Sequence, residues 1–161
     1  MFQSTAYSGQ KEKDYQLLVK QVDALSEGEH DHTALLANAS ALLNQFLTDV
    51  NWVGFYVWKE DELVLGPFQG LPASIRIGYG KGVCGTAIKE KATQRIADVH
   101  AFPGHIACDG ATNSEIVVPI ILNETIYGVL DIDSPNSDRF DEVDQTYLEQ
   151  FVHVLEKHLA G

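Results

Sequence analysis

The sequence predicts an α+β fold, in which helices from the two ends of the chain pack on one face of a central antiparallel sheet. Three observations support this prediction. Both terminal regions carry apolar residues at helical spacing, the middle of the chain contains paired apolar strands, and tight turns rather than helical crossovers join those strands. A chain of 161 residues has the size of one domain, so we expect a single domain over residues 1–161.

Two helices are expected before the first strand. Apolar residues recur at helical spacing over Tyr15–Leu25, and the segment Ser26–Gly28 should end that helix. A second apolar stripe covers Leu35–Leu47, with Asp31 or Thr33 as the N-cap of its helix. The chain therefore begins with a pair of helices that can cover one face of a sheet.

A hairpin and a glycine-rich segment follow the two helices. The segment Asn51–Trp58 is rich in aromatic and β-branched residues, and a charged turn leads from it into a return strand at Leu63–Phe68. The segment Ile75–Gly85 contains four glycines, so we expect a loop there. A short helix should then run from Cys84 to about Lys91.

The second half of the chain supplies the rest of the sheet. A short strand at Thr93–Ile96 precedes a loop at His100–Asn113, which shows little periodicity. The apolar strands Ser114–Leu122 and Thr125–Ile132 are joined by an Asn-Glu turn, which predicts a second hairpin. A final helix begins near Asp141. The resulting order, α-α-β-β-α-β-β-β-α, favours antiparallel pairing.

The charge of the chain excludes several classes of partner. It contains 11 basic and 23 acidic residues, which gives a formal net charge of −12. Such an acidic chain is poorly suited to bind nucleic acid or an anionic membrane surface. No apolar run is long enough to span a bilayer, and the first residues do not have the pattern of a signal peptide. We therefore expect a cytoplasmic protein with reduced thiols and no disulfide scaffold.

Two cysteines are the first candidates for chemistry. Cys84 stands where the glycine-rich loop enters the short helix, and there the helix N-terminus and Lys81 would stabilise a thiolate. The alternative is a buried cysteine that packs as a small apolar residue. Cys108 lies in the long loop, three residues after His105, which could raise its thiolate fraction. The residues alone leave open which of these thiols has a function.

A metal site is the other role open to the two cysteines, together with His100 and His105. Zinc sites are usually built from two close pairs of ligands, and only His105 and Cys108 are close in that sense. The glycine-rich loop lacks the residue order of a phosphate-binding loop. We therefore expect neither a metal ion nor a cofactor.

Three carboxylates are predicted to meet at one end of the second hairpin. Glu115 begins one of its strands, and Asp131 and Asp133 end the other. Counting outward from the turn puts residue 115 opposite about residue 132, level with both aspartates, which share one face. Like charges at such short range are unfavourable unless a cation lies between them. The cluster is therefore either a solvated strand end or a site for an ammonium group.

Trp52 and Tyr56 are four residues apart in the first strand, so they share a face of the sheet. Core packing is the simplest explanation for this aromatic pair.

The order of several motifs points to a known family. The segments NWVGFYVW, LGPFQGLPASIRI, GKGVCGTA, DVHAFPGHIACD, SEIVVPI and GVLDIDSP closely resemble the free methionine-(R)-sulfoxide reductases, which are single GAF domains. The resemblance runs from about Asp49 to the C-terminus. It implies a GAF-like fold and the reduction of free L-methionine-(R)-sulfoxide through a cysteine sulfenic acid and a disulfide. It also implies thioredoxin as the reductant and a homodimer.

The resemblance assigns roles to the candidate residues. Cys108, in the HIACD motif, would attack the sulfoxide sulfur, and Cys84, in the GVCG motif, would take part in the redox cycle. Trp52 and Tyr56 would surround the methionine end of the substrate. The carboxylates that would form the polar part of the pocket are Glu115, Asp131 and Asp133.

The chain departs from the family pattern at one position. Members with three cysteines carry one of them before the GKGVCG motif, where this chain has Ser74. The resemblance therefore implies that any disulfide within the chain joins Cys84 and Cys108. Two alternatives of other classes remain: a non-catalytic GAF module that senses a small ligand, and a redox-sensing domain without a substrate. Neither alternative needs both loop thiols and a carboxylate cluster.

Overall fold

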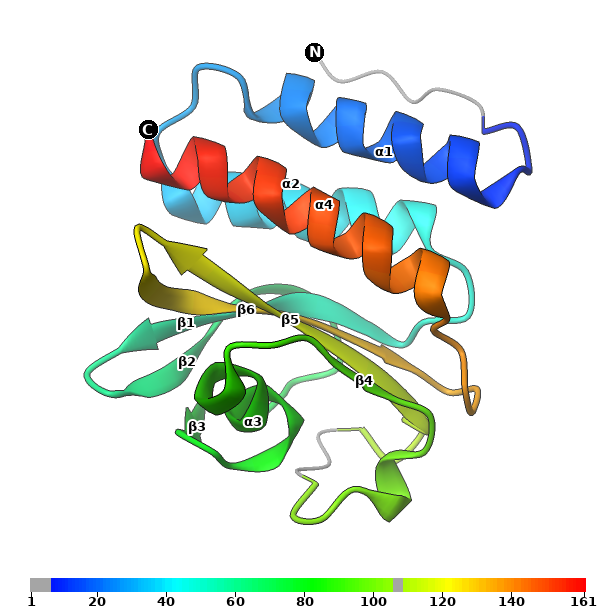
Figure 1. Ribbon diagram of the computed structural model, residues 1–161, viewed down its shortest axis with the longest axis vertical. Helices are drawn as coiled ribbons and strands as arrows, with labels where there is room; N and C mark the ends of the chain where they lie inside the picture. The colour runs from blue at the N-terminus through cyan, green and yellow to red at the C-terminus, as the bar shows by residue number, and fades with distance from the viewer. Residues whose placement is uncertain (1–6, 106–108) are drawn as a thin grey trace.

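The computed structural model describes residues 7–105 and 109–161, and within them four α-helices and a six-stranded sheet form stacked layers (Figure 1). The elements, in chain order, are α1 (Lys11–Ser26), α2 (His32–Phe46), β1 (Trp52–Lys59), β2 (Glu62–Gly70), β3 (Arg76–Gly78), α3 (Gly82–Glu90), β4 (Gln94–Ile96), the 3₁₀ turn η1 (Val99–Ala101), β5 (Ser114–Leu122), β6 (Thr125–Ser134) and α4 (Glu142–Ala160). In the described part of the chain, no helix is long and apolar enough to cross a membrane.

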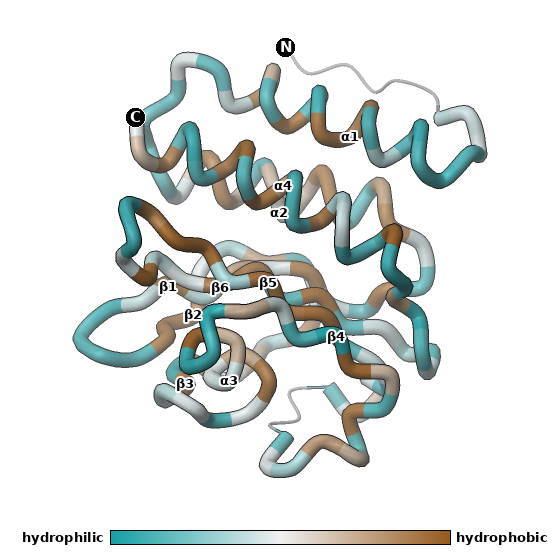
Figure 2. Tube along the Cα trace, viewed as in Figure 1, coloured by the Kyte–Doolittle hydropathy of each residue, from teal (hydrophilic) through white to brown (hydrophobic). Residues whose placement is uncertain are grey.

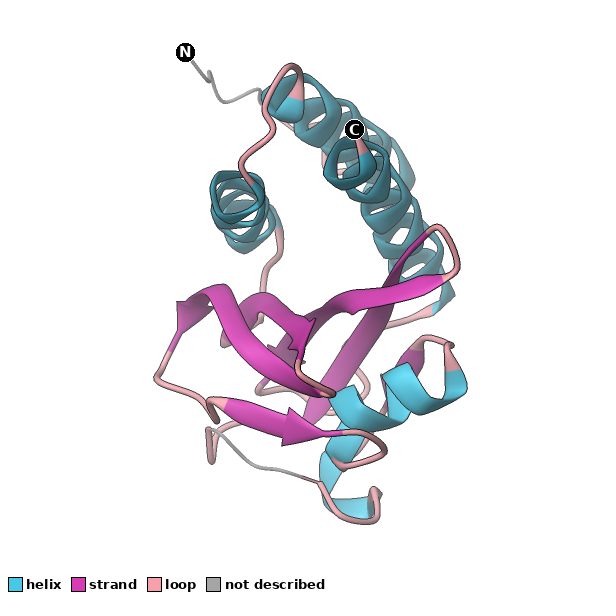
Figure 3. Ribbon diagram, turned by 90° about the vertical axis from the view of Figure 1, so that its left-hand side faces the viewer, coloured by secondary structure: helices cyan, strands magenta, loops and turns pink. Residues whose placement is uncertain are grey.

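The predicted α+β fold is confirmed. The strands follow the order β3-β2-β1-β6-β5-β4, and all the pairs between them are antiparallel. Helices α2 and α4 cover one face of the sheet and α1 packs outside them, whereas α3 lies against the opposite face (Figure 3). The sheet is therefore sandwiched between a thick layer of helices and a thin one.

The alternation of side chains along the strands builds a separate core on each face. In β1, Val53 and Phe55 join the larger cluster under α2 and α4, while Trp52 and Tyr56 join a smaller cluster with α3. Hydrophobic stretches accordingly run along the central strands and along the helices over them (Figure 2). Any polar residue on the α3 face of β5 or β6 is thus placed in a largely apolar setting.

A buried carboxylate joins the first and last helices. Asp144 of α4 is completely buried, and its oxygens accept hydrogen bonds from the Tyr15 hydroxyl at 2.5 Å and the Lys11 amine at 3.0 Å. The Arg139 guanidinium at 3.3 Å and the backbone N–H of Asp141 also donate to it. Burial and the neighbouring Asp144 raise the pKa of Tyr15, which keeps its hydroxyl a donor. The charge is satisfied by groups from both ends of the chain.

The β5–β6 hairpin contains a bulge that sets its register. Near the turn, Leu122 pairs with Thr125, but Tyr127 is an extra residue on β6, and beyond it Glu115 pairs with Asp133. The N–H of Ile121, at this bulge, donates to the Glu156 carboxylate of α4 at 2.7 Å. The pairing predicted from the turn alone, residue 115 with about 132, is therefore displaced by one residue.

Two short elements lie where the sequence predicted loops. Strand β3 interrupts the glycine-rich segment and pairs with β2, and η1 lies in the segment between β4 and β5. The Asp98 side chain caps η1 by accepting from the N–H of His100. Both elements are only three residues long, too short to show a periodicity.

We expect Gly128→Ala to destabilise the protein by about 3 kcal/mol, because a Cβ at this position of β6 would overlap the backbone carbonyl of Tyr56 on β1. Urea denaturation measures the change in free energy of unfolding. Gly110→Ala is the control, because a Cβ there has nothing within 4 Å. Equal stability of the two variants would contradict the tight approach of β1 and β6.

Candidate active site

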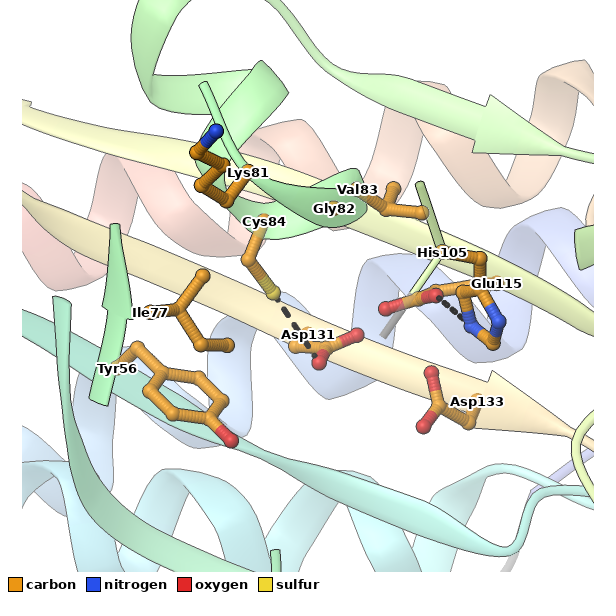
Figure 4. Close-up of a pocket in the computed structure, with 10 residues that line it drawn as sticks. All are labelled: Tyr56, Ile77, Lys81, Gly82, Val83, Cys84, His105, Glu115, Asp131 and Asp133. Atoms are coloured by element: carbon orange, nitrogen blue, oxygen red, sulfur yellow. Dashed lines mark hydrogen bonds and ion pairs between the residues drawn. The ribbon is translucent and has the colours of Figure 1, made fainter. Parts of the chain in front are cut away.

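A small cavity lies between the α3 face of the sheet and the start of α3 (Figure 4). Its volume is about 20 Å³, and a water molecule needs about 10–15 Å³ by the same measure. The side chains and backbone that line it belong to Tyr56, Ile77, Lys81, Gly82, Val83, Cys84, His105, Glu115, Asp131 and Asp133. The lining thus includes the predicted candidates Cys84, Glu115, Asp131 and Asp133, together with Tyr56.

The three predicted carboxylates meet in this cavity. Glu115, Asp131 and Asp133 are 5%, 6% and 8% exposed, so they are buried rather than at a solvated strand end. Glu115 faces Asp133 directly across the β5–β6 ladder, and Asp131 lies two residues along the same face. Burial and the neighbouring Glu115 raise the pKa of Asp131 well above its ordinary value. Asp131 is therefore a proton-bearing acid or a group that needs a cation.

The thiol of Cys84 points into the same cavity. Its Sγ lies 3.3 Å from Oδ2 of Asp131, and the residue is 4% exposed. Burial and the charges of Asp131 and Glu115 raise the pKa of Cys84 well above the ordinary value of a thiol. The expectation that the helix N-terminus and Lys81 stabilise a thiolate is therefore wrong. Figure 4 shows the reason for Lys81, whose amine points away from the thiol.

His105 forms the far side of the cavity. Its Nε2 lies 3.5 Å from Oε1 of Glu115, and its side chain is mostly buried. Burial lowers the pKa of His105, so its imidazole is neutral at neutral pH. The sequence suggests a role for His105 beside Cys108 or in a metal site, and gives no sign of its contact with Glu115. The contact with Glu115 joins segments that a local pattern does not connect.

The aromatic pair borders the carboxylates. In the β1–β6 ladder, Trp52 pairs with Asp133, and Tyr56 follows on the same face. The ring of Trp52 stacks between those of Tyr56 and Phe68. Tyr56 lines the cavity, whereas Trp52 is not among the described residues that do. Its Nε1 donates to the carbonyl of Leu71 at 3.1 Å, which fixes the loop after β2.

Comparison with known proteins identifies the family of this chain. The GAF domain family matches residues 29–159. The chain is 60% identical to the Bacillus subtilis protein YtsP, over 99% of both chains. It is 54% identical to the free methionine-R-sulfoxide reductase of Escherichia coli, over 93% of this chain and 91% of the relative. The chain belongs to the free methionine-R-sulfoxide reductase family.

A solved structure supports this assignment at the level of the fold. The free methionine-R-sulfoxide reductase of Neisseria meningitidis, in complex with its substrate, superposes with a TM-score of 0.95 and is 40% identical. The match covers 99% of this chain and 96% of the Neisseria chain. This member of the reductase family therefore has the GAF fold expected from its motifs.

Of the two other cysteine positions in the family pattern, one lies outside the described residues and the other is a serine in this chain. Cys108 lies outside the described residues, between His105, which contacts Glu115, and Asp109. Oδ2 of Asp109 accepts from the Asn51 amide at 2.9 Å, a contact that the sequence did not suggest. Ser74, which stands where some reductases have a third cysteine, offers its carbonyl to the Tyr56 hydroxyl at 2.8 Å.

We expect the Cys84 thiol to stay protonated across neutral pH, because its raised pKa favours the neutral form at every pH below that pKa. The measurement is the ultraviolet absorbance of the thiolate in a Cys108→Ser variant, where Cys84 is the remaining cysteine. Adding Asp131→Asn removes one acidic neighbour and should lower the midpoint. The urea-unfolded variant is the control, and a folded midpoint below the unfolded one would contradict this account.

Proposed function

We propose that this chain reduces free L-methionine-(R)-sulfoxide to L-methionine through a cysteine sulfenic acid and a disulfide, with thioredoxin as the reductant. The observation that carries the proposal is the convergence of three buried carboxylates and a thiol on one cavity. Family membership supports it, because relatives at 54% and 46% identity are free methionine-R-sulfoxide reductases. A cytoplasmic location is part of the proposal, because cytosolic thiols are kept reduced.

The carboxylates recognise the end of the substrate that distinguishes a free amino acid from a residue in a protein. A free amino acid carries an α-ammonium group, and buried carboxylates bind such a cation with charge-assisted hydrogen bonds. Glu115, Asp131 and Asp133 supply those acceptors, while Trp52 and Tyr56 offer apolar surface to the methyl thioether end. The ammonium in turn offsets the repulsion among the three acids.

The cavity must widen for the amino acid to enter. Its volume of about 20 Å³ accommodates one water molecule or ion, and methionine sulfoxide is several times larger. Binding therefore includes a displacement of side chains in the wall.

The reaction needs one thiol that attacks the sulfoxide and a second thiol that converts the resulting sulfenic acid into a disulfide. The attacking sulfur bonds to the sulfoxide sulfur while the sulfoxide oxygen takes up a proton. The oxygen then moves from the substrate sulfur to the cysteine sulfur as the bond between the two sulfurs breaks, so methionine leaves and the attacking cysteine becomes a sulfenic acid. The second thiol then displaces water to form a disulfide, and an external dithiol reduces that disulfide by exchange.

We assign the attack to Cys108 and the resolving step to Cys84. The neutral, buried state of Cys84 supports this order, because the thiolate is the nucleophilic form of cysteine. Cys108 carries its role from the family motif alone. A homodimer is also part of the proposal, carried over from the family.

One simple experiment distinguishes the proposed reductase from the two sensing alternatives. The purified protein is incubated with dithiothreitol and free methionine sulfoxide, and methionine is measured. A sensor of either kind would release none, whereas the proposed enzyme consumes the R epimer and leaves the S epimer.

We expect Cys108→Ser to abolish methionine release even in a single turnover, because the attacking sulfur is lost. Cys84→Ser should release about one equivalent per chain and then stall, because the sulfenic acid has no resolving thiol. Rapid-quench analysis of the pre-reduced proteins measures the burst. A burst in Cys108→Ser but not in Cys84→Ser would reverse the two roles.

We expect N-acetylation of the substrate to lower kcat/KM on the order of 10²-fold or more, because it removes the ammonium and leaves buried acids unpaired. Glu115→Gln and Asp133→Asn should lose much of this discrimination. Glu12→Gln, on the exposed surface of α1, is the matched control and should retain it. Equal rates for the free and acetylated substrates in the unaltered protein would overturn the assignment of a free amino acid.

A further inference from the structure

Four side chains in the cavity offer the mixture of donor atoms that zinc prefers. One atom each from Cys84, Glu115 and Asp131 lie within 4.8 Å of one another, and all three residues are buried. Nε2 of His105 lies 3.5 Å from Oε1 of Glu115 on the same cavity. Sulfur, imidazole nitrogen and carboxylate oxygen are the donors of tetrahedral zinc sites.

The thiol of Cys84 and the carboxylates of Asp131 and Glu115 lie close enough to share one ion, which leaves one position of a tetrahedral site open. Bond lengths of about 2.3 Å to sulfur and 2.0 Å to oxygen or nitrogen place neighbouring ligands roughly 3.3–3.5 Å apart. The separation between Cys84 Sγ and Asp131 Oδ2 is 3.3 Å, and one Glu115 oxygen lies within 4.8 Å of donor atoms of both, whereas His105 is outside this cluster and contacts Glu115 at 3.5 Å. Figure 4 shows Cys84 and Glu115 directed toward Asp131, with the His105 ring on the far side of Glu115.

A second, independent observation points to a cation. Oδ1 of Asp131 is buried and has no hydrogen-bond partner among the described residues, although the residue is only 6% exposed. A buried carboxylate oxygen in contact with other acids is costly unless a proton or a positive ion lies beside it. The cavity beside this oxygen has about 20 Å³, which suits a single ion.

We propose that the reduced protein binds one zinc ion through Cys84, Asp131 and Glu115, with His105 beside Glu115 as its outer partner, and that this ion excludes the sulfoxide substrate. The ligand set differs from the cysteine and histidine combination considered from the sequence, because it includes carboxylates of the β5–β6 ladder. Hard cations such as magnesium are not expected, because they avoid thiolate ligands. The metal site rests on geometry alone, whereas the exclusion of substrate rests on the proposed function.

Cobalt(II), a spectroscopic substitute for zinc, tests the binding without any enzyme assay. The protein, free of affinity tag and reduced with a phosphine, is titrated with Co²⁺ and then with Zn²⁺. We expect a thiolate-to-cobalt charge-transfer band, tetrahedral visible bands, saturation at one equivalent, and displacement by zinc. Absence of the charge-transfer band in the folded, reduced protein would overturn the proposal.

Three variants locate the ion. Cys84→Ser should abolish the charge-transfer band and weaken zinc binding by about 100-fold or more, because loss of an outer-shell partner alone costs roughly 10–100-fold. Asp131→Asn should weaken binding while keeping the band. His158→Gln is the control, because Asp23, Glu27 and His158 form a separate surface group of potential ligands. Circular dichroism checks folding, and a zinc affinity that Cys84→Ser leaves unchanged would contradict the site.

Inhibition is measured in a single turnover of pre-reduced protein, without added thiols that would chelate the metal. One equivalent of zinc should block methionine release, and a chelator should restore it. Release that continues with zinc bound through Cys84 would overturn the exclusion of substrate. A protein that binds zinc through Cys84 but never releases methionine, even in the absence of zinc, would retain the metal site and refute the proposed function.

Discussion

The register of the β5–β6 hairpin is the constraint on which the rest of the site depends. Directly paired residues on neighbouring strands face the same side of a sheet, so a shift of one residue moves a side chain to the opposite face. The extra residue Tyr127 lets Glu115 pair with Asp133 rather than with Ile132, whose side chain lies in the core beneath the helices. The bulge therefore brings all three carboxylates to the α3 face.

Helix α4 supports that register from the other side of the sheet. The Glu156 carboxylate accepts the N–H of Ile121 where the ladder is irregular, so the bulge leaves no unsatisfied donor at this position. The geometry of the acidic cluster is thus set by contacts on the helix face, away from the cavity itself.

The carboxylates and Cys84 control each other's ionisation. In the described structure the acids raise the pKa of the thiol, and the thiol has no cation nearby to oppose them. A cation bound among the acids reverses this effect, because it neutralises the charge that disfavours the thiolate. The occupant of the cavity therefore determines whether Cys84 is an inert buried thiol or a nucleophile.

The sequence predicted the features that depend on a local pattern of residues. It did not predict the contacts between segments that are distant in the chain. The two hairpins and the meeting of Glu115 with the aspartates follow from apolar alternation and one tight turn. The bulge at Tyr127 did not, because it reflects packing against α4 as much as the residues of the hairpin. The sequence left open whether Cys84 is a stabilised thiolate or a buried thiol, because it shows the helix N-terminus but neither the burial nor the proximity of Asp131. For the same reason the contact of His105 with Glu115 was missed.

The buried network of Asp144 bears on where the folding unit begins. The GAF family match starts at residue 29, after α1, yet Tyr15 and Lys11 of α1 donate to the completely buried Asp144 of α4. A fragment trimmed to the matched residues would retain Arg139 but would lose these two donors and the apolar cover of α1. Such a fragment would leave a carboxylate short of partners at a newly exposed apolar surface. The boundary recognised by sequence comparison is therefore narrower than the boundary required by hydrogen bonding, which includes the first helix.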